Sequence, residues 1–408
     1  MHSVIEAQQR ILSSFSKTRS SSIPLDQILG RVLAEDIFAS TDLPPFENSG
    51  MDGFAVQAKD TLGSTPDHPV FLKIIEDIPA GYVSKALIQT GQTARIMTGA
   101  AMPNGADGVV IIEDTNMKSR NPGELLSREI AIFHPVGAGS NIRMRGEDIR
   151  AGQKIIGKGT RLRPQDIGML AMMGMAVVQV QKQPRLALFS SGNELLSIDA
   201  PPEKGKIRDA NMHTLGALAQ KEGAEVIRLG VASDDPKSIE VLLEKAFELN
   251  ADLIVSSAGV SIGAFDYIKQ VVEDHGTLDF WRVNVRPGKP FAFGKYRGIP
   301  FFGLPGNPVS AFVSFKLFVS PVLNKMNGIT PENLPRETAT LMEEVTSDGR
   351  ESYLRATITI ENGSKVARLS GHQGSGNLLS LVQANALLIV PSGVKSLPAG
   401  IDVETIII

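Results

Sequence analysis

Hydrophobic and polar residues alternate over residues 184–310 in a pattern typical of an α/β domain. Apolar runs with the length of buried strands occur at residues 185–190, 224–229, 253–255 and 301–304. Two intervening segments repeat apolar residues at the spacing of an amphipathic helix, residues 211–221 and 235–247. Strands and helices that alternate in this way form parallel sheets with helices on both faces. The pattern therefore predicts a doubly wound α/β domain, whose ligands bind beyond the carboxyl ends of its strands.

The remaining segments carry other patterns and predict separate domains. The first 42 residues favour a helix followed by a second apolar stretch, and residues 163–180 return to helix and strand. Residues 69–141 contain short β-like runs that Gly and Pro divide. Beyond Pro331 and Pro335, strand-like runs continue to the end of the chain. We predict a discontinuous N-terminal domain (1–45 and 142–182), a β-rich inserted domain (46–141), an α/β domain (183–328) and a C-terminal β domain (329–408).

Small residues follow two strands of the predicted α/β domain. One such loop covers residues 256–263 and is followed by Asp266, and the other runs from Gly303 to Pro308. Small residues allow backbone N–H groups to approach an anion closely. In the second loop, Asn307 and Pro308 favour the start of a helix, whose N-terminus attracts negative charge. The two loops together predict one anion site at the carboxyl edge of the sheet.

The composition narrows the classes of chemistry that this site can support. The chain has 408 residues, 42% of them apolar, and a formal charge of −3 without a run of Lys or Arg, so a nucleic-acid partner has little electrostatic support. No cysteine is present, which excludes disulfides, thiolate nucleophiles and iron–sulfur clusters, and the six histidines show no paired ligand spacing. A hard metal ion held by carboxylates stays open. Without a signal peptide or a long apolar span, we expect a cytoplasmic protein that is not in a membrane.

Three acidic residues follow predicted strand ends. These residues are Glu194, Asp209 and Asp266. Each one alone has an ordinary interpretation as a helix cap or a first-turn acid. Three carboxylates at one edge of a sheet repel one another unless a cation compensates them, and Mg²⁺ would do so.

Two short motifs keep alternative interpretations open. Gly259-Val260-Ser261-Ile262-Gly263 matches the G-x-S-x-G nucleophile elbow of hydrolases, although Gly263 and the acid at position 266 indicate a longer loop. Arg286-Pro287-Gly288-Lys289-Pro290 is not a Walker A loop. It is either a solvated basic turn or, beside the anion loops, a cationic clamp for an oxyanion.

Six motifs, taken together and in order, resemble a known family. They are Pro44–Val56, Arg145–Asp148, Ser191–Leu195, Gly259–Gly263 with Asp266 and Tyr267, Pro287–Pro290, and Leu304–Ser310. In this order they resemble the molybdopterin molybdenumtransferase family, which includes MoeA and the gephyrin E domain. The resemblance extends over nearly the whole chain.

The resemblance implies an elongated four-domain protein that forms a homodimer. Its active site is expected in a cleft between the α/β domain of one subunit and parts of the other. The implied reaction is the Mg²⁺-dependent insertion of molybdate into adenylylated molybdopterin, with release of AMP. Transient contact with other proteins of molybdenum cofactor biosynthesis is expected as well. Two alternatives stay open, a molybdopterin adenylyltransferase and a non-catalytic scaffold like the gephyrin E domain.

The resemblance also assigns expected roles to individual residues. It places Asp209 and Asp266 as acids associated with Mg²⁺ and the phosphates. It places the molybdate pocket at Ser261, Lys289, Pro290, Arg355 and Ser375. Further catalytic or substrate-binding positions that it implies are Asp52, Thr98, Asp148, Glu194, Gly263, Arg286, Pro305, Gly306 and Asn307. The chain departs from the common pattern at Gly50, where the family often has Ala, and at Arg286, where it often has Lys.

Overall fold

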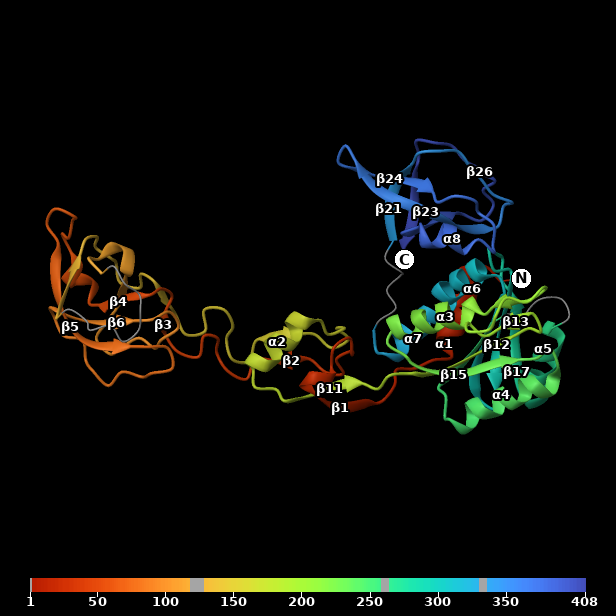
Figure 1. Ribbon diagram of the computed structural model, residues 1–408, viewed down its shortest axis with the longest axis horizontal. Coiled ribbons are helices and arrows are strands. Elements are labelled where there is room, and N and C mark those ends of the chain that lie inside the picture. The colour runs from red at the N-terminus through yellow and green to blue at the C-terminus, as the bar shows by residue number, and fades with distance from the viewer. Residues whose placement is uncertain (1, 118–127, 258–263, 330–335) are drawn as a thin grey trace. The chain divides into compact units, whose positions relative to one another are not determined.

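The computed structural model describes residues 2–117, 128–257, 264–329 and 336–408, and it divides into two compact units (Figure 1). The larger unit comprises Met1–Glu35, Lys158–Ala171 and Met175–Ile408. The smaller unit comprises Asp36–Gly157 and Met172–Gly174. The chain therefore leaves the larger unit after residue 35 and returns to it at residue 158, while the four domain boundaries set out above stay a prediction.

A six-stranded sheet lies at the centre of the larger unit, in the order β15-β12-β16-β20-β19-β17. Its strands are β12 (Arg185–Ser191), β15 (Glu225–Ala232), β16 (Leu253–Ser257), β17 (Gly276–Arg282), β19 (Pro290–Tyr296) and β20 (Ile299–Leu304). The strands from β15 to β20 are parallel, as the sequence predicted. In contrast, β19 runs antiparallel to both neighbours. The cause is local, because Arg297 and Gly298 join β19 to β20 in a two-residue turn with φ of 46° and 84°.

Helices cover both faces of this sheet, which confirms the predicted doubly wound arrangement. On one face lie α1 (Val4–Ser13), α3 (Ala210–Lys221), α6 (Pro308–Ser314), a π-helical segment (Phe315–Val319) and α7 (Ser320–Met326). On the other lie α4 (Pro236–Glu248) and α5 (Ala264–His275). Successive residues of β12 alternate between the two hydrophobic cores, since Leu186 and Leu188 pack in one and Ala187 and Phe189 in the other.

Asp residues begin two of these helices. Asp209 is the N-cap of α3, where its side chain accepts a hydrogen bond from the backbone N–H of Met212. Asp235 caps α4 in the same way through Ser238, and Pro236 occupies the first turn. Both helices therefore start where the sequence predicted, because a carboxylate satisfies one of the free N–H groups at each start.

The C-terminal strands of the larger unit close into a barrel. They are β21 (Arg336–Leu341), β23 (Glu351–Glu361), β24 (Ser364–Leu369), β25 (Ala386–Val390) and β27 (Asp402–Ile407). Pairing of β23 with β25 completes the ring, a closure that strand patterns alone do not reveal. The short strand β18 (Val285–Arg286) of the α/β domain pairs in parallel with β23. Tyr353 and Leu387 of the barrel belong to the same hydrophobic core as α1 and α3, so the barrel packs on the α/β domain.

Shorter elements complete the larger unit. They are β1 (Ser20–Pro24) paired with β11 (Val177–Gln181), α2 (Pro164–Met172), β13 (Leu195–Leu196) paired with β14 (Ile207–Arg208), β22 (Val345–Thr346) paired with β26 (Ser396–Leu397), α8 (Leu378–Val382) and a 3-10 helix (Leu25–Gln27). The β13–β14 pair leads directly to the N-cap of α3. Glu194 directly precedes β13 and Asp209 directly follows β14, so the two residues lie at opposite ends of this parallel pair.

A five-stranded sheet forms the smaller unit, in the order β7-β4-β6-β5-β8. Its strands are β4 (Gly53–Val56), β5 (Val70–Ile78), β6 (Gln92–Ile96), β7 (Gly108–Ile111) and β8 (Glu129–Ile132). The smaller unit also contains β2 (Ile37–Phe38) paired with β10 (Lys154–Ile156), β3 (Asn48–Ser49) paired with β9 (Ile142–Arg143), and the 3-10 helices Ala58–Thr61 and Ile112–Asp114. Hydrophobic clusters cover both faces of the sheet, as in the predicted β-rich domain.

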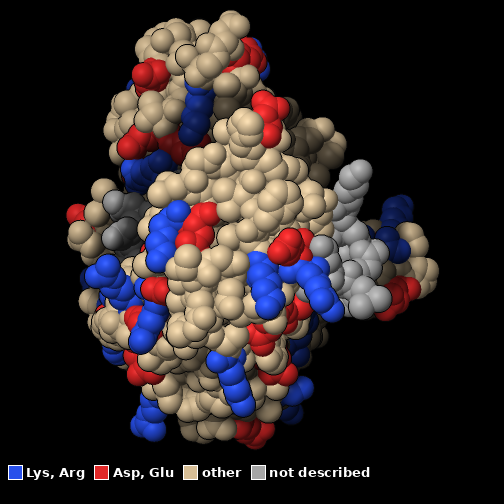
Figure 2. Space-filling view, turned by 90° about the vertical axis from the view of Figure 1, so that its left-hand side faces the viewer, with Lys and Arg blue, Asp and Glu red and all other residues tan. Residues whose placement is uncertain are grey.

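The surface charges are of both signs. Figure 2 shows Lys and Arg side chains interspersed with Asp and Glu over the face turned to the viewer. Among the helices of the described residues, none combines the length and apolar character that crossing a membrane requires.

Close packing of β4 against β7 gives a stability prediction. A Cβ atom at Gly53 would lie 2.0 Å from the carbonyl oxygen of Val110, so Gly53→Ala must push the two strands apart. We expect it to destabilise the smaller unit by about 1 to 3 kcal/mol, which is typical of overpacking. Hydrogen exchange followed by mass spectrometry should show lost protection in β4 and β7.

Gly168 provides the control for this substitution. It lies in α2, and its added Cβ would meet no atom within 4 Å. Gly168→Ala should leave exchange in β4 unchanged and stabilise α2 by about 0.5 to 1 kcal/mol. Unchanged protection in Gly53→Ala would contradict the packing argument.

Candidate active site

Asp209 combines a capping role with an unsatisfied oxygen atom. The residue is 6% exposed, and its Oδ1 accepts the N–H of Met212 at 3.0 Å. Its second oxygen, Oδ2, is buried and has no hydrogen-bond partner in the described structure. The capping interpretation of Asp209 is therefore correct but incomplete, because a buried carboxylate oxygen without a partner is costly. A cation or a donor on a ligand would satisfy it.

Asn211, two residues further on, is a site residue that sequence reasoning missed. Its Nδ2 donates to the Oγ of Ser257 and to the carbonyl oxygen of Gly306, both at 2.7 Å. Because a carbonyl oxygen only accepts, these bonds fix the orientation of the amide. Oδ1 of Asn211 is then a second buried acceptor without a partner. The only sequence signal was its place in the first turn of a helix at the sheet's carboxyl edge.

Asp209 and Asn211 line a cavity of about 330 Å³ at the carboxyl ends of β16 and β20, which we call the first cavity. The predicted residues that line it are Glu194, Asp209, Pro290, Pro305, Gly306 and Asn307. They come from four separate segments of the α/β domain. The structure therefore brings together the strand-end loops that the sequence assigned to one site, apart from the part outside the described residues.

A second cavity of about 360 Å³ lies where the α/β domain meets the barrel. The predicted residues that line it are Arg286, Lys289, Pro290, Asn307, Arg355 and Ser375. Arg350 also lines it, a residue that the sequence did not single out. All the lining residues lie in the described part of the chain; four carry positive charge and none is acidic. The second cavity is thus suited to an anion.

Pro290 and Asn307 line both cavities and so form the wall between them. Asn307 precedes α6 as the sequence predicted, but its side chain makes no capping hydrogen bond. Its Nδ2 instead donates to the Oγ of Ser375 at 3.1 Å, and the N–H of Val309 donates to the carbonyl oxygen of Ser375 at 3.0 Å. The amide of Asn307 therefore joins the barrel to the start of α6 through its donor group, while its oxygen makes no capping bond.

Arg355 is the most buried of the four cations, with 1% of its surface exposed. Its guanidinium donates to the carbonyl oxygens of His372 and Gly374 and to the Oγ of Ser380, at 2.9 to 3.1 Å. Burial, and after it the charge of Arg286, lowers the pKa of Arg355 from its ordinary value. Arg355 therefore organises the loop that carries Ser375 while it adds positive charge to the cavity.

Comparisons with known proteins agree along the whole chain. Family models match residues 2–174 (MoeA N-terminal region, domain I and II), 187–325 (probable molybdopterin binding domain) and 338–408 (MoeA C-terminal region, domain IV). The molybdopterin molybdenumtransferase 2 of Mycobacterium tuberculosis (strain H37Rv) is 36% identical over 412 residues, which cover 99% of each chain. The chain belongs to the molybdopterin molybdenumtransferase family.

Other relatives agree with this assignment. A molybdopterin molybdenumtransferase of a Nostoc species is 36% identical, with 92% of this chain and 85% of that protein covered. The crystal structure of the molybdopterin biosynthesis MoeA protein of Pyrococcus horikoshii OT3 superposes with a TM-score of 0.81, at 32% identity and with both chains fully covered. Membership of a transferase family removes the reason for interpreting Gly259–Gly263 as a hydrolase elbow.

Three of the predicted residues of this family member lie in its smaller unit. Asp52 and Thr98 contact each other, since Oδ1 of Asp52 accepts the N–H of Thr98 at 2.8 Å and its hydroxyl at 2.7 Å. Asp148 is exposed and forms an ion pair of 2.6 Å with Arg143. The roles implied for these side chains stay predictions, as do those of the residues around the two cavities.

Three other predicted residues concern the loop after β16. Ser261 and Gly263 lie outside the described residues. Asp266 belongs to α5, but its side chain is not part of the described structure. Among the described residues, no group of three or more His, Asp or Glu side chains converges on a metal site. Mg²⁺ needs only one or two carboxylates besides substrate oxygens, so the free Oδ2 of Asp209 still fits such an ion.

The backbone of the loop between β18 and β19 provides a test of the second cavity. Gly288 has φ of +109°, and a Cβ atom there would lie 2.6 Å from the Oγ of Ser314. Gly288→Ala should displace Arg286 and Lys289 and strain the backbone by about 1 to 3 kcal/mol. We expect weaker binding of molybdate or sulfate in calorimetry.

Ser314→Ala serves as the control, because it removes only a buried hydroxyl that has no hydrogen-bond partner. It should bind the anion as the unmodified protein does. If Gly288→Ala retained full anion affinity, the loop would not be the cationic wall of the cavity.

Proposed function

We propose that this protein is a molybdopterin molybdenumtransferase that inserts molybdate into adenylylated molybdopterin and releases AMP, with Mg²⁺ as the divalent ion. The observation that carries the proposal is the second cavity. It is lined by no acid and by four cations, of which Arg350 is paired with Asp348. It shares a wall with the first cavity, which is lined by Asp209 with its unsatisfied carboxylate oxygen. An oxyanion and a phosphate-bearing substrate thus have adjacent places to bind.

Molybdate is a tetrahedral dianion and fits the chemistry of the second cavity. Arg286 and Lys289 offer charge from the α/β domain, and Arg355 and Ser375 offer charge and a hydroxyl from the barrel. Charged donors of this kind bind dianions more strongly than neutral donors do. The chain's contribution is to hold the oxyanion beside Pro290 and Asn307, next to the first cavity.

The first cavity is assigned to the phosphates of the adenylylated substrate. Asp209 would hold Mg²⁺ through Oδ2, and Asp266 is implied as its partner by the family resemblance. Mg²⁺ in such a place neutralises charge on the leaving phosphate. The N-terminus of α3 also favours phosphate oxygens close to its first turn.

The proposed reaction requires no protein nucleophile. The two dithiolene thiols of the pterin displace one oxide of molybdate, which leaves as water with the two thiol protons. A water molecule attacks the phosphoanhydride bond, so that AMP leaves and the pterin keeps its own phosphate. Side chains of this protein only bind, orient and neutralise charge, which is where most of the stabilisation in such reactions arises. The proposal includes the homodimer, the expected cleft between subunits and the transient contacts with other proteins of cofactor biosynthesis.

The two alternatives have weaker support. An adenylyltransferase would need only the α/β domain, whereas the chain matches molybdenumtransferases of known sequence over 99% of its length. A non-catalytic scaffold would have no use for a cationic cavity beside an unsatisfied carboxylate. Incubation of the purified protein with adenylylated molybdopterin, Mg²⁺ and molybdate, with AMP release and cofactor formation followed, tests the proposal directly.

Lys289 gives the first functional prediction. Lys289→Ala removes a full charge from the second cavity, so the molybdate concentration needed for half-maximal AMP release should rise by about ten- to 150-fold. Added Mg²⁺ should not rescue it. Lys295→Ala is the matched control, because Lys295 is an exposed lysine of β19 outside the cavity. An unchanged molybdate requirement in Lys289→Ala would refute the assignment of this cavity.

Asp209 gives the second functional prediction. Asp209→Asn keeps an N-cap acceptor but loses the charge, so the fold should persist while Mg²⁺ binding weakens by about ten- to 100-fold. Binding of Mn²⁺, followed by electron paramagnetic resonance, measures this without turnover. Asp235→Asn changes an equivalent cap on α4 and should have no effect. Asp266→Asn should resemble Asp209→Asn, and normal Mn²⁺ binding in both would exclude the metal role.

A further inference from the structure

We propose that Arg350 is a positioning residue for the second cavity and that Asp348 keeps it in place. Arg350 holds the backbone of Val285 against the barrel, and Val285 directly precedes the cationic loop, residues 286–290. Arg350 therefore acts on the oxyanion through Arg286 and Lys289 rather than by binding it. The inference rests on the proposed use of this cavity by molybdate.

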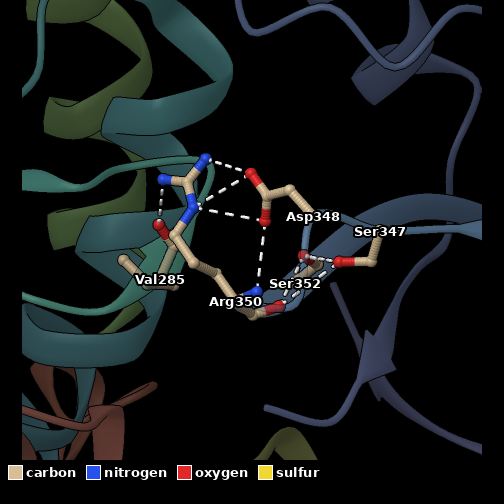
Figure 3. A network of polar contacts seen from close by, with 5 residues as sticks. All are labelled: Val285, Ser347, Asp348, Arg350 and Ser352. Carbon is tan, nitrogen blue, oxygen red and sulfur yellow. Dashed lines mark hydrogen bonds and ion pairs between the residues drawn. The ribbon is translucent and has the colours of Figure 1, made fainter. Parts of the chain in front are cut away.

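Arg350 contacts a carboxylate of the barrel and a carbonyl of the α/β domain at the same time (Figure 3). Its Nη2 and Nε donate to Oδ2 of Asp348 at 2.5 and 3.0 Å, and Nε also approaches Oδ1 at 3.2 Å. Its Nη1 donates to the carbonyl oxygen of Val285 at 3.2 Å. Val285 directly precedes Arg286, so this bond fixes the chain where the cationic loop begins.

The turn that carries Arg350 is itself held by several bonds. The backbone N–H of Arg350 donates to Oδ1 of Asp348 at 3.1 Å, and its carbonyl oxygen accepts the hydroxyl of Ser352 at 2.9 Å. Ser347 and Ser352 are joined through their hydroxyls at 2.9 Å. The side-chain hydrogen bond from Arg350 lowers the pKa of Asp348 to about 2, so the pair stays charged at neutral pH. These contacts fix the position of the Arg350 guanidinium.

Backbone pairing also joins the α/β domain to the barrel next to Arg350. Val285 and Arg286 pair in parallel with Glu351 and Ser352, the residues that follow Arg350. The junction brings Arg286 and Lys289 of one domain close to Arg355 of the other, where like charges repel. An additional unpaired cation there would increase the repulsion. Arg350 joins the two domains without adding one, since Asp348 neutralises its charge while Nη1 binds Val285.

The planar guanidinium of arginine allows a test that separates positioning from charge. A guanidinium can bind a carboxylate with two nitrogens and a carbonyl with the third, whereas the single ammonium group of lysine cannot reproduce this geometry. Arg350→Lys should therefore fail like Arg350→Ala. If Arg350 instead bound the oxyanion through its charge, lysine would restore most of the activity, and removal of Asp348 would strengthen anion binding.

The experiment measures the KM for molybdate and the kcat of AMP release in the full-length protein. We expect Arg350→Ala and Arg350→Lys to raise the KM about tenfold, with kcat within about twofold. Asp348→Asn keeps the size of the side chain and should raise the KM less, about threefold. Calorimetric binding of AMP and Mn²⁺ binding report on the first cavity and should not change.

Arg368→Ala is the matched control. Arg368 also belongs to the barrel and makes a comparable two-pronged ion pair with Glu361, but it does not line the cavity. Its loss should leave the KM for molybdate unaltered. Thermal unfolding of every variant verifies that the fold is retained.

Several outcomes would overturn the inference. These are a normal KM in Arg350→Ala, rescue by Arg350→Lys, a lower KM in Asp348→Asn, or an equal effect of Arg368→Ala. Lys289→Ala separates this inference from the proposed function. If Lys289→Ala raises the KM and the Arg350 variants do not, only the positioning role fails; if Lys289→Ala has no effect, the assignment of the cavity to molybdate fails.

Discussion

Mutual repulsion of positive charges is the constraint on which the rest of the candidate site depends. Arg286, Lys289, Arg350 and Arg355 surround one cavity that has no acidic residue in its lining. Such an arrangement is unfavourable without a bound anion, so other contacts have to hold the cations in place. Arg355 donates to carbonyl and hydroxyl oxygens, and Arg350 is paired with Asp348, which is not among the residues that line the cavity. The remaining repulsion between these positive charges decreases when an oxyanion binds, and this favours binding.

The first cavity differs in charge, since its lining includes Glu194 and Asp209 together with Arg208. Oδ2 of Asp209 and Oδ1 of Asn211 are buried acceptors without partners, placed at the start of α3. A cation or a hydrogen-bond donor of a ligand would satisfy these two oxygens, whereas an anion would compensate the positive charges of the second cavity. Because Pro290 and Asn307 line both, the two complementary environments lie side by side. A reaction that joins an oxyanion to a phosphate-bearing substrate needs this combination. The first cavity lies within the α/β domain, whereas the second also needs residues of the barrel.

The barrel therefore contributes residues to the candidate site. Its core is continuous with that of the α/β domain through Tyr353 and Leu387, and Ser375 is bonded to both ends of the Asn307–Val309 turn. Packing of this kind makes the relative placement of the two domains depend on many small contacts. The hydrogen bond from Arg350 to Val285 is one of the polar contacts between the two domains at the edge of the cavity. A charged turn before a strand of the barrel can therefore influence the placement of the cationic loop.

The sequence by itself determined the local elements and the kinds of residue at the site. Strand and helix alternation, the Asp caps of α3 and α4 and the small-residue loops follow from periodicity and capping, which act over a few residues. Tertiary structure decided the contacts between distant segments. Nδ2 of Asn211 reaches Gly306 across 95 positions, Asn307 reaches Ser375 across 68, and Arg350 reaches Val285 across 65. Local patterns also predicted a cap at Asn307 but could not show that its amide would bind the barrel instead. Closure of the barrel, the unsatisfied oxygens and the sharing of four cations by one cavity depend on how the domains pack, and no short-range pattern encodes that packing.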